Sequence, residues 1–317
     1  MVTVQDIHNA RARIAGRVHL TPMIGSSTIA RRIGAASFEL KCESVQKTGS
    51  FKVRGVLNKL SQLTDADRAR GVVTVSAGNH AQAMAWGARA AGVKCTVVMP
   101  ANASRTKVAA SIGYGATVIQ HGTGADAFRM ALELADSEGF TFVHPFDDEQ
   151  IIAGAGTAGL EVLEQSPSPD VVVVPVGGGG LIAGIAVAVK ETSPNTRVIG
   201  VEPAGAAVMR QSLDAGRALN MVSMHTIADG LAAPMAGAHN FDIVKRYVDD
   251  VVLVSDDEIV EAMKELLSRC KLLAEPAGAA ATAAVLAGKI PLQGTERVVA
   301  LLSGGNVDLE RLATLVA

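Results

Sequence analysis

Aromatic residues and cysteines are scarce in this chain. Only 3% of its 317 residues are aromatic, and there is a single Trp. The three cysteines, Cys42, Cys95 and Cys270, are odd in number and far apart, which argues against a disulfide framework and a CxxC metal or redox motif. The sequence therefore does not resemble a small disulfide-stabilised secreted domain, and a reducing, cytoplasmic setting is predicted.

The chain also lacks a strong charge of one sign and a membrane-spanning pattern. It has 29 Lys and Arg against 31 Asp and Glu, a formal charge of −2, so no nucleic-acid partner is predicted. The first residues carry no apolar leader pattern. The segment from Val171 to Val189 is uncharged, but Pro175 and the glycines after it would break a membrane helix. No membrane partner is expected.

What is present is a hydrophobic chain with an alternating pattern. Hydrophobic residues make up 49%, enough for a sizeable core, and the length suggests two domains. Short β-branched runs alternate with Ala-rich stretches of helical length, which is typical of βαβ units. Strands are predicted at 72–77, 95–100, 116–121, 140–145, 171–176, 197–202, 251–254 and 298–302, and helices at 80–91, 105–112, 125–138 and 181–191.

These strands are apolar almost throughout, as in a parallel sheet covered on both faces. We therefore predict the α/β class, with two open, mostly parallel α/β domains. Residues 70–147 would form a small domain, and residues 1–69 plus 148–317 a large, ligand-binding one. The cleft between them is the expected ligand site.

Four consecutive glycines, Gly177, Gly178, Gly179 and Gly180, follow a predicted buried strand and open a helix. Their unobstructed N–H groups, together with the helix dipole, favour a phosphate group. Gly178, Gly180 and Ala183, with Glu202 further on, also satisfy the dinucleotide fingerprint, so a nicotinamide cofactor remains an alternative. No Gly-Lys-Ser or Gly-Lys-Thr follows, which argues against a nucleoside-triphosphate loop.

Three other motifs are ambiguous when taken singly. Lys52 stands at the predicted start of a helix, where the positive end of the dipole lowers the pKa of an amine. Ser76 is predicted to cap the helix after the first strand, where free N–H groups could bind a carboxylate. Ser303 ends the last strand. An isolated lysine is more often solvated, and the two serine motifs alone are consistent with a cap and a turn.

Taken together and in order, the motifs resemble those of the fold-type II pyridoxal-phosphate enzymes, and among them the threonine dehydratase and serine racemase branch. The matching segments span nearly the whole chain: SFKVRG at 50–55, SAGNHAQA at 76–83, HPFDD at 144–148, IAGAGT at 152–157, VPVGGGG at 174–180, IADG at 227–230 and LLSGGN at 301–306. The resemblance implies a tryptophan synthase β-like fold with pyridoxal 5′-phosphate in the cleft between the domains.

The resemblance also implies roles for individual residues. Lys52 would bind the cofactor covalently and move the Cα proton. Phe51 would pack on the pyridine ring, Asn79 would meet the ring 3′-oxygen, and Ser303 would face the ring nitrogen, where a serine makes the ring a weaker electron sink than an aspartate would. The phosphate would be held by Gly177, Gly178, Gly179 and Gly180, and the substrate carboxylate by Ser76, Gly78, Asn79 and His80.

The chain departs from its relatives at three positions. Racemases of this branch carry a serine acid/base where this chain has Ala77, which favours elimination over racemisation. Relatives with a divalent cation have an acidic residue in place of Val208. Binding of Mg²⁺ by Glu202 and the Ala206 carbonyl would therefore be weaker in this chain. Ala155 replaces a glutamine that lies near the cleft in many relatives, and a changed substrate preference could result.

The resulting prediction is an ammonia-lyase that converts an L-β-hydroxy amino acid, L-threonine or L-serine, to a 2-oxo acid and ammonia, and that works as a homodimer. The alternatives are a serine racemase, a dehydratase for hydroxyaspartate or phenylserine, a nicotinamide enzyme, and a non-catalytic protein that binds a phosphate ligand.

Overall fold

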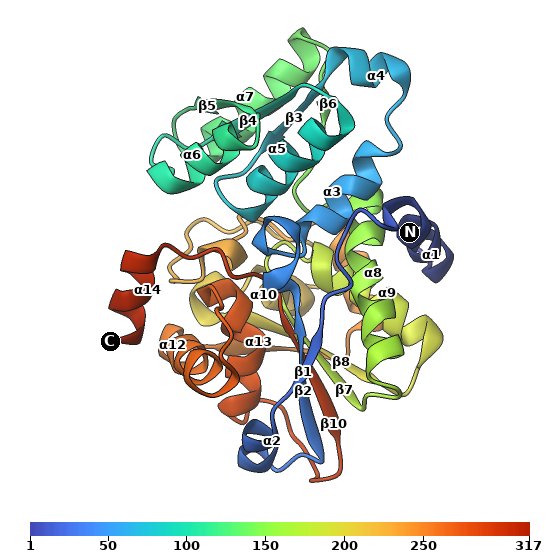
Figure 1. Cartoon of the computed structure of the whole chain (residues 1–317), viewed down its shortest axis with the longest axis vertical. Coiled ribbons are helices and arrows are strands. Elements are labelled where there is room, and N and C mark those ends of the chain that lie inside the picture. The colour runs from blue at the N-terminus through green and yellow to red at the C-terminus, as the bar shows by residue number, and fades with distance from the viewer.

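The computed structural model describes all 317 residues, which form two separate sheets (Figure 1). The six-stranded sheet has the order β1-β2-β10-β7-β8-β9, and the four-stranded sheet has the order β5-β4-β3-β6. Every strand pair is parallel except β1 with β2. The strands are β1 (Met23–Gly25), β2 (Ser37–Cys42), β3 (Val72–Val75), β4 (Cys95–Met99), β5 (Thr117–Gln120), β6 (Thr141–Phe142), β7 (Val171–Pro175), β8 (Arg197–Pro203), β9 (Asp250–Val254) and β10 (Arg297–Leu302).

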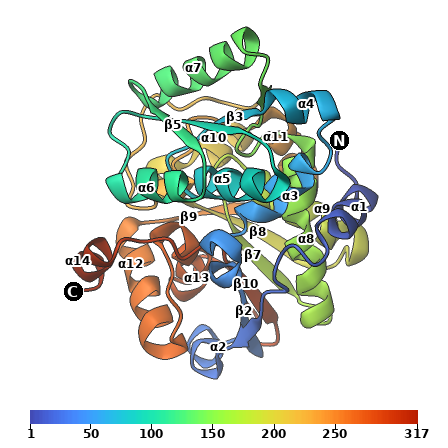
Figure 2. The same cartoon turned by 45° about the horizontal axis from the view of Figure 1, so that its top comes forward.

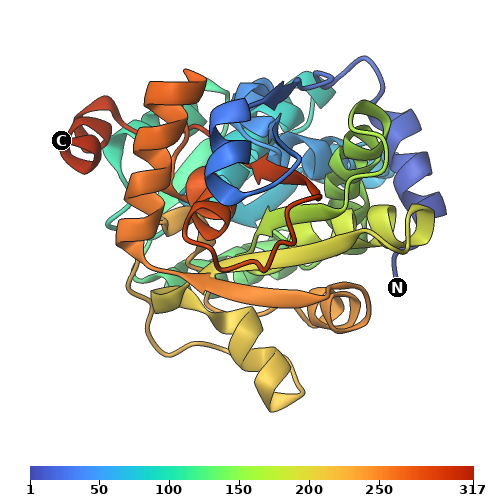
Figure 3. The same cartoon turned by 90° about the horizontal axis from the view of Figure 1, so that it is seen from below.

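Helices connect these strands and cover the sheets. They are α1 (Val4–Ile14), α2 (Ser27–Ile33), α3 (Lys52–Leu60), α4 (Asp65–Arg70), α5 (Asn79–Ala91), α6 (Arg105–Gly113), α7 (Gly124–Ser137), α8 (Glu149–Gln165), α9 (Gly180–Thr192), α10 (Val208–Ala215), α11 (Ala238–Tyr247), α12 (Asp256–Glu265), α13 (Pro276–Leu286) and α14 (Leu309–Val316). The chain ends lie on opposite sides of the molecule, as the view from below shows (Figure 3). No helix is both long and apolar enough to cross a membrane.

Both faces of the six-stranded sheet are buried, which explains its apolar strands. Along β7, Val171 and Val173 pack with helices α2, α12 and α13, whereas Val172 and Val174 pack with α8, α9 and α11. This alternation follows from the two-residue period of a strand. A parallel sheet covered on both faces needs this kind of sequence, so the composition accounts for the architecture.

The four-stranded sheet is covered in the same way. Helix α5 packs on one face together with α3, and α7 packs on the other. Figure 2 shows α7 on the outer side of this sheet and α5 on the side that faces the six-stranded sheet. Helix α3, which begins at Lys52, therefore lies between the two sheets.

A buried ionic network fixes helix α3. Arg54 is fully buried and donates to both carboxylate oxygens of Glu43, at 2.8 Å each, and to both of Glu161, at 2.7 and 2.8 Å. These partners lie beside β2 and on α8. Bidentate pairs of this kind fix orientation as well as distance. The network therefore holds helix α3 in place at Arg54, only two residues after Lys52.

The predicted α/β class with two mostly parallel sheets is confirmed, and each predicted strand and helix is present within a few residues. All four strands of the smaller sheet fall within residues 72–142. The domain limits at 70 and 147 remain a prediction. Strands β1 and β2, which form one edge of the six-stranded sheet, were not predicted from the sequence.

Candidate active site

Lys52 lies at the first position of α3, between the two sheets. Its Nζ donates a hydrogen bond of 2.9 Å to the Pro145 carbonyl and lies 5.1 Å from the centre of the Phe51 ring. Burial lowers the pKa of Lys52 from its ordinary value to about 8, although the carboxylate of Glu275 partly opposes this effect. An amine with this pKa is partly neutral near pH 7 to 8, as reaction with a carbonyl requires.

The four glycines form the predicted turn between β7 and α9. The N–H groups of Gly177, Gly178 and Gly179 donate to no acceptor of the chain, although Gly178 and Gly179 are buried. Buried N–H groups are normally paired, so the turn is suited to an anionic ligand. A side chain at Gly178 would meet the Phe146 ring, and Gly179 has φ +98°, a value that favours glycine.

A hydrogen-bonded chain joins the two sheets beside Lys52. Asn79, at the start of α5, donates through Nδ2 to Glu275 at 2.6 Å and accepts from Asn306 Nδ2 at 2.8 Å. Asn306 also donates to the Thr48 carbonyl at 2.7 Å. Asn79 Nδ2 donates to no other acceptor of the chain, and its predicted contact with a ring oxygen stays a prediction. Burial raises the pKa of Glu275 to about 7, so this carboxyl titrates in the same range as Lys52.

Ser303 lies where the sequence predicted, at the end of β10. Its carbonyl accepts a hydrogen bond of 3.1 Å from the Phe51 N–H, and Ser50 forms a β-bridge with Gly304. The residue is 5% exposed. The segment with Lys52 and the segment after the last strand are thus bonded directly, which brings two motifs far apart in sequence into one site.

The turn that begins α5 differs in detail from the prediction. Ser76 does not cap the helix. Gly78 occupies the N-cap position, and Ser76 Oγ accepts the Gly78 N–H at 3.1 Å in the preceding turn. The first N–H groups of α5, from Asn79 onward, have no partner within the helix. They can bind a carboxylate, and Ala77 between Ser76 and Gly78 contributes only a methyl group.

The side chain of His80 is unsuited to a carboxylate. Thr74 Oγ1 donates to the Val143 carbonyl at 2.7 Å, so it must accept from His80 Nε2, 3.0 Å away. This assignment leaves Nδ1 as a buried acceptor without a partner. Burial also lowers the pKa of His80 well below its ordinary value and keeps the ring neutral. Only its backbone N–H suits the predicted contact with a substrate carboxylate.

The predicted cation site does not fit a divalent metal. Both oxygens of Glu202 accept N–H groups of α10, from Met209 and Arg210 at 2.8 Å each. Val208 is buried at the start of that helix, Ala206 lies in the preceding turn, and no group of three His, Cys, Asp or Glu residues could hold a metal. Glu202 therefore serves as the N-terminal partner of α10.

Ala155 lies in the core and not on an open surface. It is 1% exposed on α8, in the apolar cluster that includes Val174 and Leu301, with Phe51 packed against the cluster. Its methyl group is therefore part of the apolar cluster against which Phe51 packs. The predicted effect of this position on substrate preference stays a prediction.

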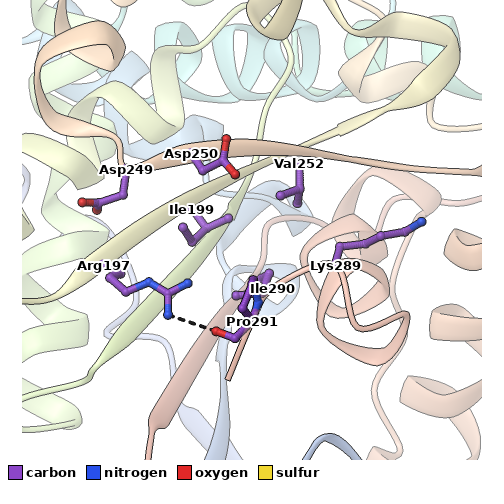
Figure 4. A pocket seen from close by; sticks show the side chains of 8 residues that line it. All are labelled: Arg197, Ile199, Asp249, Asp250, Val252, Lys289, Ile290 and Pro291. Atoms are coloured by element: carbon purple, nitrogen blue, oxygen red, sulfur yellow. Dashed lines mark hydrogen bonds between the residues drawn. The ribbon is translucent and has the colours of Figure 1, made fainter. Parts of the chain in front are cut away.

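A separate surface pocket lies at the amino ends of β8 and β9, where Arg197 donates to the Pro291 carbonyl at 3.1 Å (Figure 4). The charged groups there are engaged by the fold: Asp249 pairs with Lys190 at 2.8 Å and accepts the Val198 N–H at 2.7 Å. The glycine turn follows the other, carboxyl end of the sheet. This pocket is therefore not part of the site around Lys52.

A partly buried lysine of lowered pKa beside unpaired glycine N–H groups defines a site for a phosphorylated carbonyl cofactor. Residues 14–304 match the family described as "Pyridoxal-phosphate dependent enzyme", and the chain belongs to this family. The cofactor predicted from the sequence is confirmed at the level of the family, and the residues described above fit it.

Relatives with reported names are similar over nearly their whole length. The catabolic L-threonine dehydratase of Escherichia coli is 44% identical over 99% of this chain and 96% of its own. A threonine deaminase from the source abbreviated T.th. has a TM-score of 0.91 and 42% identity, covering 97% of this chain and 99% of its own. A serine racemase from Dictyostelium discoideum has the same TM-score, 41% identity and the same coverage.

Proposed function

We propose that this protein is an ammonia-lyase that converts L-threonine, L-serine or both to the corresponding 2-oxo acid and ammonia. The main support for this proposal is the lowered pKa of Lys52. A value of about 8 suits both the capture of a carbonyl group and proton transfer at neutral pH. The names of the relatives support the reaction type, since a dehydratase and a deaminase for threonine are both more than 40% identical to the chain.

When bound, pyridoxal phosphate supplies a carbonyl for the substrate amine and an electron sink that makes the Cα proton acidic. The part played by the chain is proton movement and positioning. Lys52 takes the Cα proton, and the β-hydroxyl group leaves as water after gaining a proton. The unsaturated amine that remains becomes an imine, which water hydrolyses to the 2-oxo acid and ammonia.

Recognition of the substrate carboxylate falls to the start of α5. The N–H groups of Asn79 and His80 occupy the first turn, where the helix dipole also favours an anion. Gly78 has no side chain to obstruct an approaching ligand. The space where its Cβ would lie is open, with no heavy atom within 4 Å. A carboxylate held at this point would be anchored close to Lys52, because Asn79 is bonded to Glu275, whose charge acts on the lysine.

Racemisation is the second candidate, because a serine racemase is 41% identical and of the same fold. Moving a proton to the opposite face of Cα needs a second acid or base. The residue expected there is Ala77, which has no exchangeable proton. Elimination from one enantiomer is therefore favoured over interconversion of two.

The test is to incubate the protein, loaded with pyridoxal phosphate, with a panel of substrates and to measure 2-oxo acid, ammonia and the D-enantiomer. The panel holds L-threonine, L-serine, L-hydroxyaspartate and L-phenylserine, which also covers the alternative dehydratases. We expect 2-oxo acid from threonine or serine and little D-amino acid. Abundant D-serine with little pyruvate would make the protein a racemase, and 2-oxo acid from hydroxyaspartate or phenylserine alone would reassign the substrate.

Two variants sharpen this test. Lys52→Ala should abolish 2-oxo acid formation and the borohydride-sensitive absorbance of the bound cofactor, whereas Lys94→Ala, at an exposed lysine, should change neither. Ala77→Ser restores a hydroxyl group at the position of the racemase residue and should raise D-serine formation. If Ala77→Ser leaves the ratio of D-serine to pyruvate unchanged, this position does not decide between the reactions.

We also propose that the protein is a homodimer in the cytoplasm. The dimer rests on the family resemblance, and light scattering on the purified protein tests it. The three cysteines are free, and two of them are buried, which suits a reducing compartment.

A further inference from the structure

We propose that Asn240 is a positioning residue of the phosphate site, which aims the N–H of Gly179 at the phosphate group. The inference rests on the use of pyridoxal phosphate by the protein and not on which amino acid is converted. Asn240 belongs to none of the motifs that identified the site in the sequence. It lies on α11, which follows the IADG motif at 227–230 in the sequence.

The side chain of Asn240 is fully buried and bridges two backbone segments of the site. Its Nδ2 donates to the Gly178 carbonyl at 2.8 Å and to the Phe146 carbonyl at 3.1 Å. The Gly178 carbonyl accepts a second hydrogen bond, from the Gly237 N–H, at 3.1 Å. Two donors from the start of α11 therefore hold this one carbonyl of the glycine turn.

Fixing that carbonyl also fixes the direction of the next N–H. In a planar trans peptide, the C=O of one residue and the N–H of the following residue point in opposite directions. Because the Gly178 oxygen is held toward α11, the Gly179 N–H must point away from α11. This N–H meets no acceptor of the chain. The turn requires a φ of +98° at Gly179, which glycine can adopt because it has no Cβ.

The orientation of the Asn240 amide is determined by these contacts. Both Nδ2 hydrogens face carbonyl oxygens, so turning the amide over would place Oδ1 against the two oxygens. As it stands, Oδ1 is buried without a hydrogen-bond partner. A buried unpaired acceptor destabilises a protein, so this side chain is poorly explained by stability alone.

The hydrogen bond from Asn240 to the Phe146 carbonyl links Asn240 to the segment that contacts Lys52. Phe146 places its ring where a side chain of Gly178 would lie, and the Pro145 carbonyl beside it accepts the Lys52 amine. Asp147, next in sequence, accepts the N–H groups of Ala238 and His239 at 2.9 and 3.0 Å. The start of α11 thus holds residues 145–147 and the glycine turn in one fixed arrangement.

The test compares two ligands of the cofactor-free protein, pyridoxal phosphate and pyridoxal, which lacks the phosphate. Asn240→Ala should raise the dissociation constant of pyridoxal phosphate about tenfold, or about 1.4 kcal/mol, and that of pyridoxal less than about twofold. Asn240→Leu fills the same space without a donor and should behave alike. Asn240→Ser keeps one donor and should lie between them and the unaltered protein, and Lys245→Ala, exposed on the same helix, should change neither constant.

A second readout is the phosphorus resonance of bound pyridoxal phosphate. We expect it to be independent of pH in the unaltered protein and to titrate in Asn240→Ser, because a loosened turn admits water to the phosphate. Equal losses of affinity for both ligands, or no loss for either with an unchanged phosphorus resonance, would overturn the proposal. Failure of the unaltered protein to bind pyridoxal phosphate would instead overturn the proposed function.

Discussion

Replacing Lys52 with methionine should stabilise the cofactor-free protein at neutral pH. Lys52 is held where burial lowers its pKa, so the folded state disfavours the charged amine that the unfolded chain carries. Methionine has a similar length and no charge. The substitution should therefore raise the free energy of unfolding while it removes the amine on which the proposed reaction depends.

The magnitude follows from the pKa of Lys52. Its value falls from 10.5 to about 8, and each tenfold change in proton affinity corresponds to about 1.4 kcal/mol, so burial of the charge opposes folding by roughly 3 kcal/mol. Loss of the hydrogen bond to the Pro145 carbonyl returns about 1 kcal/mol. The net gain expected for Lys52→Met is about 2 kcal/mol.

The gain in the free energy of unfolding should depend on pH. The folded pKa is depressed, so the destabilisation is complete below about pH 8 and disappears as the pH rises to 10.5, where the unfolded amine also loses its proton. Urea unfolding of both proteins at pH 7, 9 and 10.5 measures the effect, with Lys94→Met as the exposed control. No gain at pH 7, or a gain of equal size at pH 7 and 10.5, would show that burial of the Lys52 charge does not oppose folding.

Three other substitutions test other parts of the site. Glu275→Gln should stabilise the protein by about 2 to 3 kcal/mol above pH 7 and not below pH 4.5, because burial raises the pKa of this carboxyl from 4.5 to about 7; urea unfolding against pH measures it, and a gain below pH 4.5 would contradict it. Gly178→Ala should abolish binding of pyridoxal phosphate, since the methyl group would displace the Phe146 ring, whereas Gly124→Ala, where space is open, should not; retained binding in a titration would argue against the glycine turn. Arg54→Met leaves the buried carboxylate of Glu43 without its cation, while Lys41 still pairs with Glu161 at 2.6 Å, and should lower the free energy of unfolding by about 3 to 5 kcal/mol; a loss below about 1 kcal/mol would mean that water reaches the network.

The sequence was sufficient to predict the architecture and the glycine turn because both depend on local patterns. The apolar strands of the six-stranded sheet and the four glycines from Gly177 onward carry their meaning within a few residues. The short strand β1 could not be predicted in this way. It has only three residues, and its pairing with β2 arises from the packing of the whole sheet.

Contacts between distant segments were also beyond the sequence. Nothing in the segment LLAEPAG indicates that Glu275 pairs with Asn79, as it does in the structure. Asn240 had no signal at all, since a single amide on an amphipathic helix is unremarkable until Gly178 is seen beside it. For His80, the deciding contact is with Thr74, whose hydroxyl proton is already committed to a strand carbonyl.

In the proposed reaction, Lys52 is the base that drives elimination from an L-β-hydroxy amino acid. The most direct measurement uses L-threonine deuterated at Cα and compares the rate of 2-oxobutanoate formation by the unaltered protein with that by Lys52→Ala, each loaded with pyridoxal phosphate. We expect product from the unaltered protein, a slower rate with the deuterated substrate, and no product above background from Lys52→Ala. Product formation by Lys52→Ala at an undiminished rate would contradict this expectation.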